Sequence, residues 1–219
     1  MVFKFISNLK NSEKGTTLIE IAVVLFIIAL FFTIMIIGLP EIERRFALSR
    51  STYRLAQDLR KARDLSISGV KIKDDEDNEI IPQGYGVYID RNRDQINYVI
   101  YADVSGVDQM YTASDPYNYC NEAQIGPDCV IDIVDVSKEN PSLYIKKLIT
   151  TVIDVGGVPT TSENNNTVSI NFLPPNPDVK IVNPFSGEDF NSIEIVLGID
   201  GSSNERIVFI NKAGLINIQ

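Results

Sequence analysis

The chain has 219 residues, a formal net charge of −9 and no histidine. A protein that neutralises nucleic-acid phosphates needs a basic face, so the acidic balance argues against nucleic-acid binding as the main function. Histidine is the commonest general base and metal ligand, and we therefore expect no enzyme activity, no cofactor and no metal.

A single carboxylate, Glu20, precedes a segment without any charged residue, residues 21–40. A run of about 20 apolar residues spans the roughly 30 Å hydrocarbon core of a membrane as one helix, whereas an acidic side chain deep in the bilayer costs on the order of 3 kcal/mol. We therefore predict a membrane-spanning helix and a functional role for Glu20. Lys4, Lys10 and Lys14 come before it, as the positive-inside rule predicts for a cytoplasmic N-terminus.

Immediately before the apolar run the chain reads Lys14-Gly15-Thr16-Thr17-Leu18-Ile19-Glu20. This motif resembles the N-terminal signature of type IV pilins and of the pseudopilins of type II secretion, in which a short basic leader is cut after a glycine. The resemblance implies a leader of residues 1–15, cleavage between Gly15 and Thr16 by a prepilin peptidase, and N-methylation of Thr16. The chain departs from the family at Thr16, where Phe or Met is usual.

The resemblance also implies how the protein assembles. In the family's filaments the acid that lies four residues after the new N-terminal residue pairs with the free N-terminal amine of a neighbouring subunit. Glu20 would thus meet the amine of Thr16 on the next subunit, which compensates two charges that are each costly in an apolar bundle. Further implied partners are other pilin or pseudopilin subunits, an inner-membrane platform protein and an ATPase. The expected location is the cytoplasmic (inner) membrane, crossed once with the head extracytoplasmic, and then a filament in the periplasm or at the cell surface.

Three other interpretations of the chain compete with this resemblance. An ordinary secretory signal peptide has an apolar stretch of about 7–15 residues and then a small-residue cleavage site, but this run is longer and no Ala-x-Ala follows it. A monomeric, membrane-anchored protein whose head binds a ligand would explain the length but not Glu20. A DNA-uptake minor pilin would need basic surface, and the densest basic stretch, residues 54–63, has the helical spacing of a solvated stripe with Asp58 and Asp64.

The helical signal continues beyond the apolar run. Residues 41–68 contain no Pro or Gly, and small or apolar side chains recur at steps of three and four. The positions concerned are Leu48, Thr52, Leu55, Leu59, Ala62 and Ser66. We expect a kink at Gly38 and Pro40 and an end at Gly69. Residues 55–69 resemble the end of the long helix in minor, H-type pseudopilins.

After Gly69 the hydrophobic period changes from helical to alternating, which predicts strands. We expect strands at residues 84–90, 96–103, 167–173, 193–199, 206–210 and 215–218. Residues 103–127 and 174–191 are predicted to be loops, and residues 206–216 resemble the final hairpin of H-type pseudopilins. The expected fold is α+β, with a leader (1–15), a membrane-spanning helix (16–40), its amphipathic continuation (41–68) and an antiparallel β-sheet or sandwich head (69–219).

The chain has two cysteines, Cys120 and Cys129. Zinc needs four ligands, which Cys and His cannot supply here. An extracytoplasmic head lies in an oxidising compartment, so a disulfide between them is expected. The alternative is two reduced thiols that are buried separately.

Two acidic stretches have some features of calcium loops. Residues 74–79 offer many oxygen ligands, and residues 90–94 have the alternating acids that open a calcium loop. The second stretch lacks the glycine and the distant bidentate glutamate of such a loop. A solvated loop and a hairpin turn, respectively, are the favoured interpretations.

Overall fold

The computed structural model describes residues 16–73, 79–104, 109–111, 120, 128–154, 156–175 and 178–219, apart from the side chain of Ile37. It contains one long helix, α1 (Leu18–Ser68), and antiparallel β-sheets, so the predicted α+β class is confirmed. The chain divides into two compact units, Met1–Glu43 and Arg44–Gln219. The N-terminal part of α1 therefore belongs to the first unit, and its C-terminal part shares the second unit with the strands.

In the first unit, α1 starts directly after Thr17 and runs without interruption through Pro40. Proline removes one backbone donor and crowds the preceding turn, which bends a helix more readily than it ends one. The predicted continuity of the helix past Pro40 is thus confirmed, and the kink stays a prediction.

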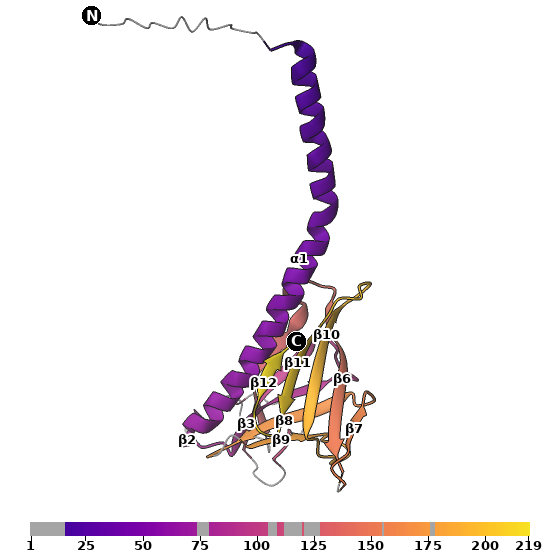
Figure 1. Ribbon diagram of the computed structural model, residues 1–219. Coiled ribbons are helices and arrows are strands. Elements are labelled where there is room, and N and C mark those ends of the chain that lie inside the picture. Colours follow the sequence, from indigo (N-terminus) through magenta and orange to yellow (C-terminus); the bar gives the residue numbers. More distant parts are fainter. Residues whose placement is uncertain are drawn as a thin grey trace, which may run out of the picture. The chain divides into compact units, whose positions relative to one another are not determined.

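The second unit holds two five-stranded sheets in which every hydrogen-bonded neighbour is antiparallel (Figure 1). The first sheet, in the order β5-β4-β3-β8-β9, comprises β3 (Gly84–Asp90), β4 (Asn97–Asp103), β5 (Asp128–Asp135), β8 (Thr167–Leu173) and β9 (Asp178–Val182). The second sheet, in the order β12-β11-β10-β6-β7, comprises β6 (Leu143–Ile153), β7 (Pro159–Ser162), β10 (Ser192–Ile199), β11 (Glu205–Asn211) and β12 (Ile216–Ile218). A short pair, β1 (Ile72–Lys73) and β2 (Glu79–Ile80), and a 3-10 turn, η1 (Val136–Lys138), complete the described elements.

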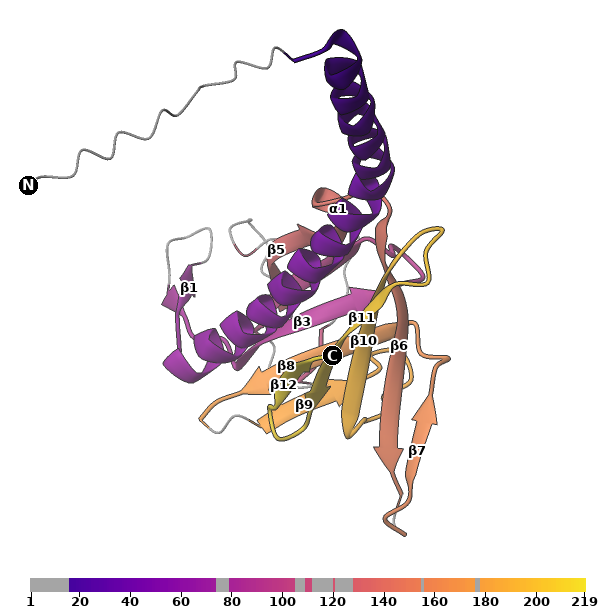
Figure 2. The ribbon, with the colours of Figure 1, turned by 45° about the horizontal axis from the view of Figure 1, so that its top comes forward.

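The strands of the two sheets run crosswise to one another, as both ribbon views show (Figures 1 and 2). One cluster of buried side chains includes residues of both sheets and of α1. Alternate residues of a strand point to the same face, so Tyr85, Val87 and Ile89 of β3 enter this cluster together. The second unit therefore has a single main core shared by one helix and two sheets.

The C-terminal part of α1 contributes one face to this core. Leu48, Leu55, Leu59 and Ala62 are buried, as their three- and four-residue spacing predicts. Two hydroxyls on the same face fix the helix to the strands and their connections. Ser51 Oγ donates to the Val136 carbonyl at 3.0 Å, and Ser66 Oγ donates to the Phe172 carbonyl at 2.6 Å.

The predicted strands all exist, with ends that differ by at most one residue. The loop prediction for residues 174–191 is wrong, because β9 (Asp178–Val182) lies within it and pairs with β8. Three prolines before this short segment and one after it dominated the sequence pattern, although Val179 and Ile181 alternate as in a strand and are buried. Strands β5, β6 and β7 were not predicted. The loop prediction for residues 103–127 falls mostly outside the described residues.

The first sheet also carries a small cluster on its other face. Tyr88, Tyr101 and Tyr111 are buried there, with ring centroids 4.6 Å apart for Tyr88–Tyr111 and 4.9 Å for Tyr101–Tyr111. Gly86 makes room for it, since a Cβ at this position would lie 2.5 Å from the Tyr101 ring and 2.4 Å from the Ile170 carbonyl oxygen. Strands β3, β4 and β8 are thus buried on both faces, which gives the head a rigid centre.

Candidate functional site

The start of α1 is closed by a reciprocal pair of hydrogen bonds. The Glu20 backbone N–H donates to Thr17 Oγ1 at 3.3 Å, and the Thr17 backbone N–H donates to Glu20 Oε2 at 3.3 Å. This arrangement is a capping box, in which an N-cap Thr and a Glu three residues later each satisfy a backbone donor that has no partner within the helix. A carboxylate in the first turn also interacts favourably with the helix dipole.

Glu20 therefore has a local structural role that our interpretation of the sequence missed. The signal was present, because Thr-x-x-Glu before an apolar run is the capping-box pattern. Thr16, the predicted new N-terminus, is exposed, and Gly15 and the rest of the predicted leader lie outside the described residues. Pairing of Glu20 with a neighbouring subunit involves a second chain and stays a prediction.

The helix that follows presents its apolar side chains outward. Exposed large hydrophobic side chains occur throughout residues 18–36 and again at Leu39. The most apolar 18-residue window of α1 has a mean hydropathy of 3.1 and is not buried within the chain. By length and composition α1 can cross a membrane once, a property that signal sequences near an N-terminus share. The described residues of the chain leave this apolar surface uncovered.

The polar group inside this apolar stretch is satisfied within the helix. Thr33 Oγ1 donates to the Ala29 carbonyl at 2.8 Å. In lipid, hydroxyl groups are tolerated when they bond to the preceding turn in this way. Thr33 is therefore compatible with a lipid-facing or helix-facing position.

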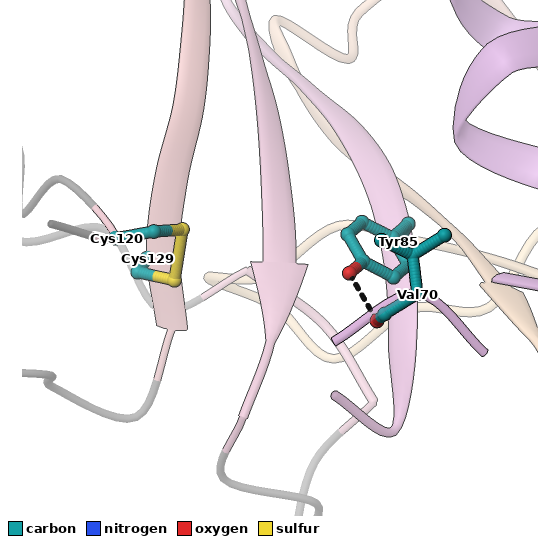
Figure 3. Close-up of a disulfide and its surroundings, with 4 residues drawn as sticks. All are labelled: Val70, Tyr85, Cys120 and Cys129. Carbon is teal, nitrogen blue, oxygen red and sulfur yellow. Dashed lines mark hydrogen bonds between the residues drawn. A yellow bond between two sulfur atoms is a disulfide. The ribbon is translucent and has the colours of Figure 1, made fainter. Parts of the chain in front are cut away.

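The predicted disulfide is present (Figure 3). Cys120 and Cys129 are joined, with their Cα atoms 4.8 Å apart. Cys129 lies in β5, and the Cys120 N–H donates to the Val130 carbonyl at 3.1 Å, so the disulfide and this hydrogen bond hold Cys120 against β5. On β3, Tyr85 OH donates to the Val70 carbonyl at 2.7 Å and attaches the segment after α1 to the same sheet (Figure 3). These contacts are structural and leave no reactive thiol.

The second of the two acidic stretches is an ordinary turn. Residues 90–94 form the β3–β4 turn, where Asp90 Oδ1 accepts from the N–H of Asn92 at 3.0 Å and from Thr167 Oγ1 at 3.1 Å. Asp94 binds its own turn through the N–H of Ile96 at 2.8 Å. The hairpin interpretation is therefore confirmed, whereas Asp74–Asn78 lies outside the described residues. Among the described residues there is no cluster of three or more His, Cys, Asp or Glu suited to a metal.

The basic stretch of α1 is only partly a solvated stripe. Lys61 is exposed, and Arg63 lies 3.5 Å from Asp64. Asp58, however, accepts a hydrogen bond from Tyr98 OH on β4. Burial, and secondarily the neighbouring Asp58 carboxylate, raise the pKa of Tyr98 above its ordinary range, so this phenol stays a donor. The Tyr98–Asp58 bond thus joins the helix to the first sheet, a role that helical spacing alone does not reveal.

No family model, no curated protein and no solved structure matches this chain. The assignment of a function therefore depends on the residues themselves. The N-terminal motif comprises Thr16, Glu20 and the apolar helix that follows. These residues lie together at the start of α1. The disulfide belongs to the head and plays a separate, structural part.

Proposed function

We propose that the chain is a minor, H-type-like subunit of a type II secretion pseudopilus or a type IV pilus. A prepilin peptidase cuts it between Gly15 and Thr16, and the mature subunit joins the filament through the N-terminal part of α1. The β-rich head then lies outside the cytoplasm. Assembly needs no chemistry from this subunit, because an ATPase and a platform protein supply the work and the guidance.

One observation carries the proposal. A Lys-Gly-Thr-Thr-Leu-Ile-Glu motif stands directly before an uncharged helical stretch whose described side chains are exposed. A soluble protein does not leave so large an apolar surface uncovered. A lipid bilayer covers it in the precursor, and equivalent helices of neighbouring subunits cover it in a filament.

The geometry of Glu20 suits two successive roles. Its Oε2 accepts the N–H of Thr17, which is a peptide N–H both before and after removal of the leader. No hydrogen bond is made to Oε1 by the described residues of this chain, so this oxygen is available to a cationic amine. After cleavage, the amine of Thr16 on a neighbouring subunit would bind there while the capping box stays closed.

The first experiment is the intact mass of the protein extracted from host membranes. A mass equal to that of residues 16–219, with or without one methyl group, would establish prepilin-type processing. Gly15→Ala should prevent processing and leave the full-length mass. An uncut wild-type chain in a host with an active prepilin peptidase would instead favour a monomeric, membrane-anchored binding protein.

Three variants separate the two roles of Glu20. Glu20→Gln retains an oxygen that can accept the Thr17 N–H but removes the charge, since Gln also occupies this position of capping boxes. Glu20→Ala removes both, and Thr17→Ala removes only one capping bond. If amine pairing drives assembly, Glu20→Gln and Glu20→Ala should both be processed but fail to enter filaments, and Thr17→Ala should enter them. Normal incorporation of Glu20→Gln would show that Glu20 only caps the helix.

A further inference from the structure

A shallow polar cleft lies where three chain turns of the head meet. Its volume is about 320 Å³, at the lower end of the roughly 300–1,000 Å³ range of small-molecule sites. The β3–β4 turn, the connection from β7 to β8 and the turn after β9 line it. The lining residues are Asn92, Asn164, Asn165, Asn166, Thr167, Asn183, Phe185 and Ser186.

Partly buried hydrogen bonds hold the floor of this cleft in place. Arg91 Nη1 donates to Asn166 Oδ1 at 2.6 Å, while its Nε and Nη2 donate to the carbonyls of Ile145 and Lys146. Asn165 Nδ2 donates to Thr150 Oγ1 at 2.7 Å, and Asn165 Oδ1 accepts from Asn183. The three turns are therefore cross-linked, and the cleft is formed before any ligand arrives.

The cleft offers no charge to a ligand. Two charged groups next to its floor, Arg91 and Asp90, are engaged in hydrogen bonds within the protein. The described lining consists of amides, hydroxyls and one phenyl ring. The described lining supplies no cation to bind a phosphate or a carboxylate, and no carboxylate to bind a divalent cation. Its apolar surface is too small to bind a lipid. A ligand of this cleft must be neutral and rich in hydrogen-bonding groups.

Two of the lining amides and the ring are available at its rim. The side chains of Asn92 and Asn164 are exposed and make no hydrogen bond to the described residues. Each amide provides two donors and one acceptor. Phe185 is 72% exposed, while its backbone N–H is fixed by Asn183 Oδ1 at 3.0 Å, so an uncovered aromatic face stands on an ordered turn.

We propose that this cleft binds one neutral sugar ring of a carbohydrate. Amides that donate and accept side by side match the vicinal hydroxyls of a pyranose, and an aromatic face packs against the apolar C–H face of the same ring. The open shape suits a terminal or exposed sugar of a larger glycan, with a dissociation constant of about 1 mM for a single ring. This inference concerns the head and does not depend on the proposed processing or filament assembly.

The test uses the full chain, solubilised in a phosphocholine detergent because maltoside and glucoside detergents would compete. Saturation-transfer NMR would be recorded with maltose and with N,N′-diacetylchitobiose, and with tetraglycine as a neutral amide ligand. We expect transfer to the C–H protons of at least one disaccharide. Transfer to neither disaccharide, or a stronger response from tetraglycine, would overturn the proposal, and the latter would indicate a peptide site.

Variants place the binding in the cleft. Phe185→Ala and Asn164→Ala remove exposed side chains, so the head should stay folded, as the thermal unfolding midpoint would verify. We expect each to weaken sugar binding at least fivefold. The matched control is Leu215→Ala, which removes a similarly exposed apolar side chain elsewhere on the head and should leave binding unchanged. Sugar binding that survives both cleft substitutions would contradict the assignment.

Discussion

The two parts of α1 place their apolar side chains in opposite environments. In the part before Glu43 the helix is almost wholly apolar and its side chains are exposed, as at Leu25. In the part after Arg44 the helix is rich in charged residues, yet Leu55 and Leu59 are completely buried. The more hydrophobic part is thus the one that the chain leaves uncovered.

This difference indicates which contacts stabilise each part of α1. Burial of a leucine side chain contributes about 1.5–3 kcal/mol, so the second part of α1 is held by its own head. The first part gains nothing comparable within the chain. Under the proposed function a bilayer or other subunits would stabilise its apolar surface, and substitutions there should affect insertion and assembly rather than folding of the head.

The largest expected effect tests whether the two parts of α1 contribute differently to the stability of the head. Leu59→Ala creates a cavity in the core and should lower the free energy of unfolding of the head by about 2–5 kcal/mol. Leu25→Ala removes the same atoms from an exposed position and should change it by less than about 0.5 kcal/mol. Denaturant unfolding of both full-length variants in detergent, followed by near-UV circular dichroism, measures the two values. Equal losses would mean that the first part of α1 also belongs to the folded head.

A smaller effect distinguishes hydrogen bonds between α1 and the strands of the head from hydrogen bonds within α1. Ser66→Ala deletes the hydroxyl that donates to the Phe172 carbonyl and should cost about 0.5–1.5 kcal/mol of unfolding free energy. Ser68→Ala is the matched control, because Ser68 Oγ donates to the Asp64 carbonyl of the same helix. Its loss should be close to zero in the same denaturant experiment. A larger loss for Ser68→Ala would reverse our assignment of the buried face.

The capping box should have a local effect only. Thr17→Ala should destabilise the first turn of α1 by about 1 kcal/mol and speed amide hydrogen exchange at residues 18–21. The unfolding midpoint of the head should not move. Thr33→Ala, whose hydroxyl bonds within the helix, is the control and should leave exchange in the first turn unchanged. Unaltered exchange in Thr17→Ala would argue against the capping box.

The smallest effect concerns alkaline pH. Burial raises the pKa of Tyr98 in the folded protein, so the folded state holds this proton where an unfolded tyrosine, with a pKa near 10, releases it. The stabilisation is complete below about pH 10 and declines as the pH rises further. Tyr98 should contribute less than about 1 kcal/mol to the decline at pH 10.5.

Comparison with Tyr98→Phe isolates this contribution. The pKa values of Tyr85 and Tyr101 are also raised by burial, so the wild-type curve contains several tyrosine contributions. Stability measured between pH 8 and pH 11 should therefore fall less steeply in Tyr98→Phe than in the wild type. Parallel curves would indicate that Tyr98 titrates normally and that the helix is not held to the first sheet through Asp58.

Sequence periodicity predicted the elements well where the pattern was long or clean. The buried face of the second part of α1 followed from residues three and four apart, and the strand at Thr167–Leu173 followed from strict alternation. β9 was missed because a five-residue strand between prolines gives a short signal. β5 and β6 were missed although they carry alternating apolar residues over part of their length.

The candidate sites differ in how far apart their residues lie in the sequence. The cleavage motif, Glu20 and the apolar helix are contiguous, so they can be recognised by reading the chain in order. The amide-lined cleft cannot, since Arg91 and Asn166, whose side chains hydrogen-bond in its floor, are 75 positions apart. The Tyr98–Asp58 bond likewise joins residues that are 40 positions apart and belong to different elements.

Local features of this protein follow from the sequence alone: a helix long and apolar enough for a membrane, its amphipathic continuation, the capped start and half of the described strands. These follow from side-chain periodicity and from interactions within a few residues. Tertiary packing establishes three further features, namely the crosswise arrangement of the two sheets, the burial of β3 on both faces and the meeting of three turns at the cleft. Such contacts depend on packing between distant segments, for which nearby residues carry no periodic signal.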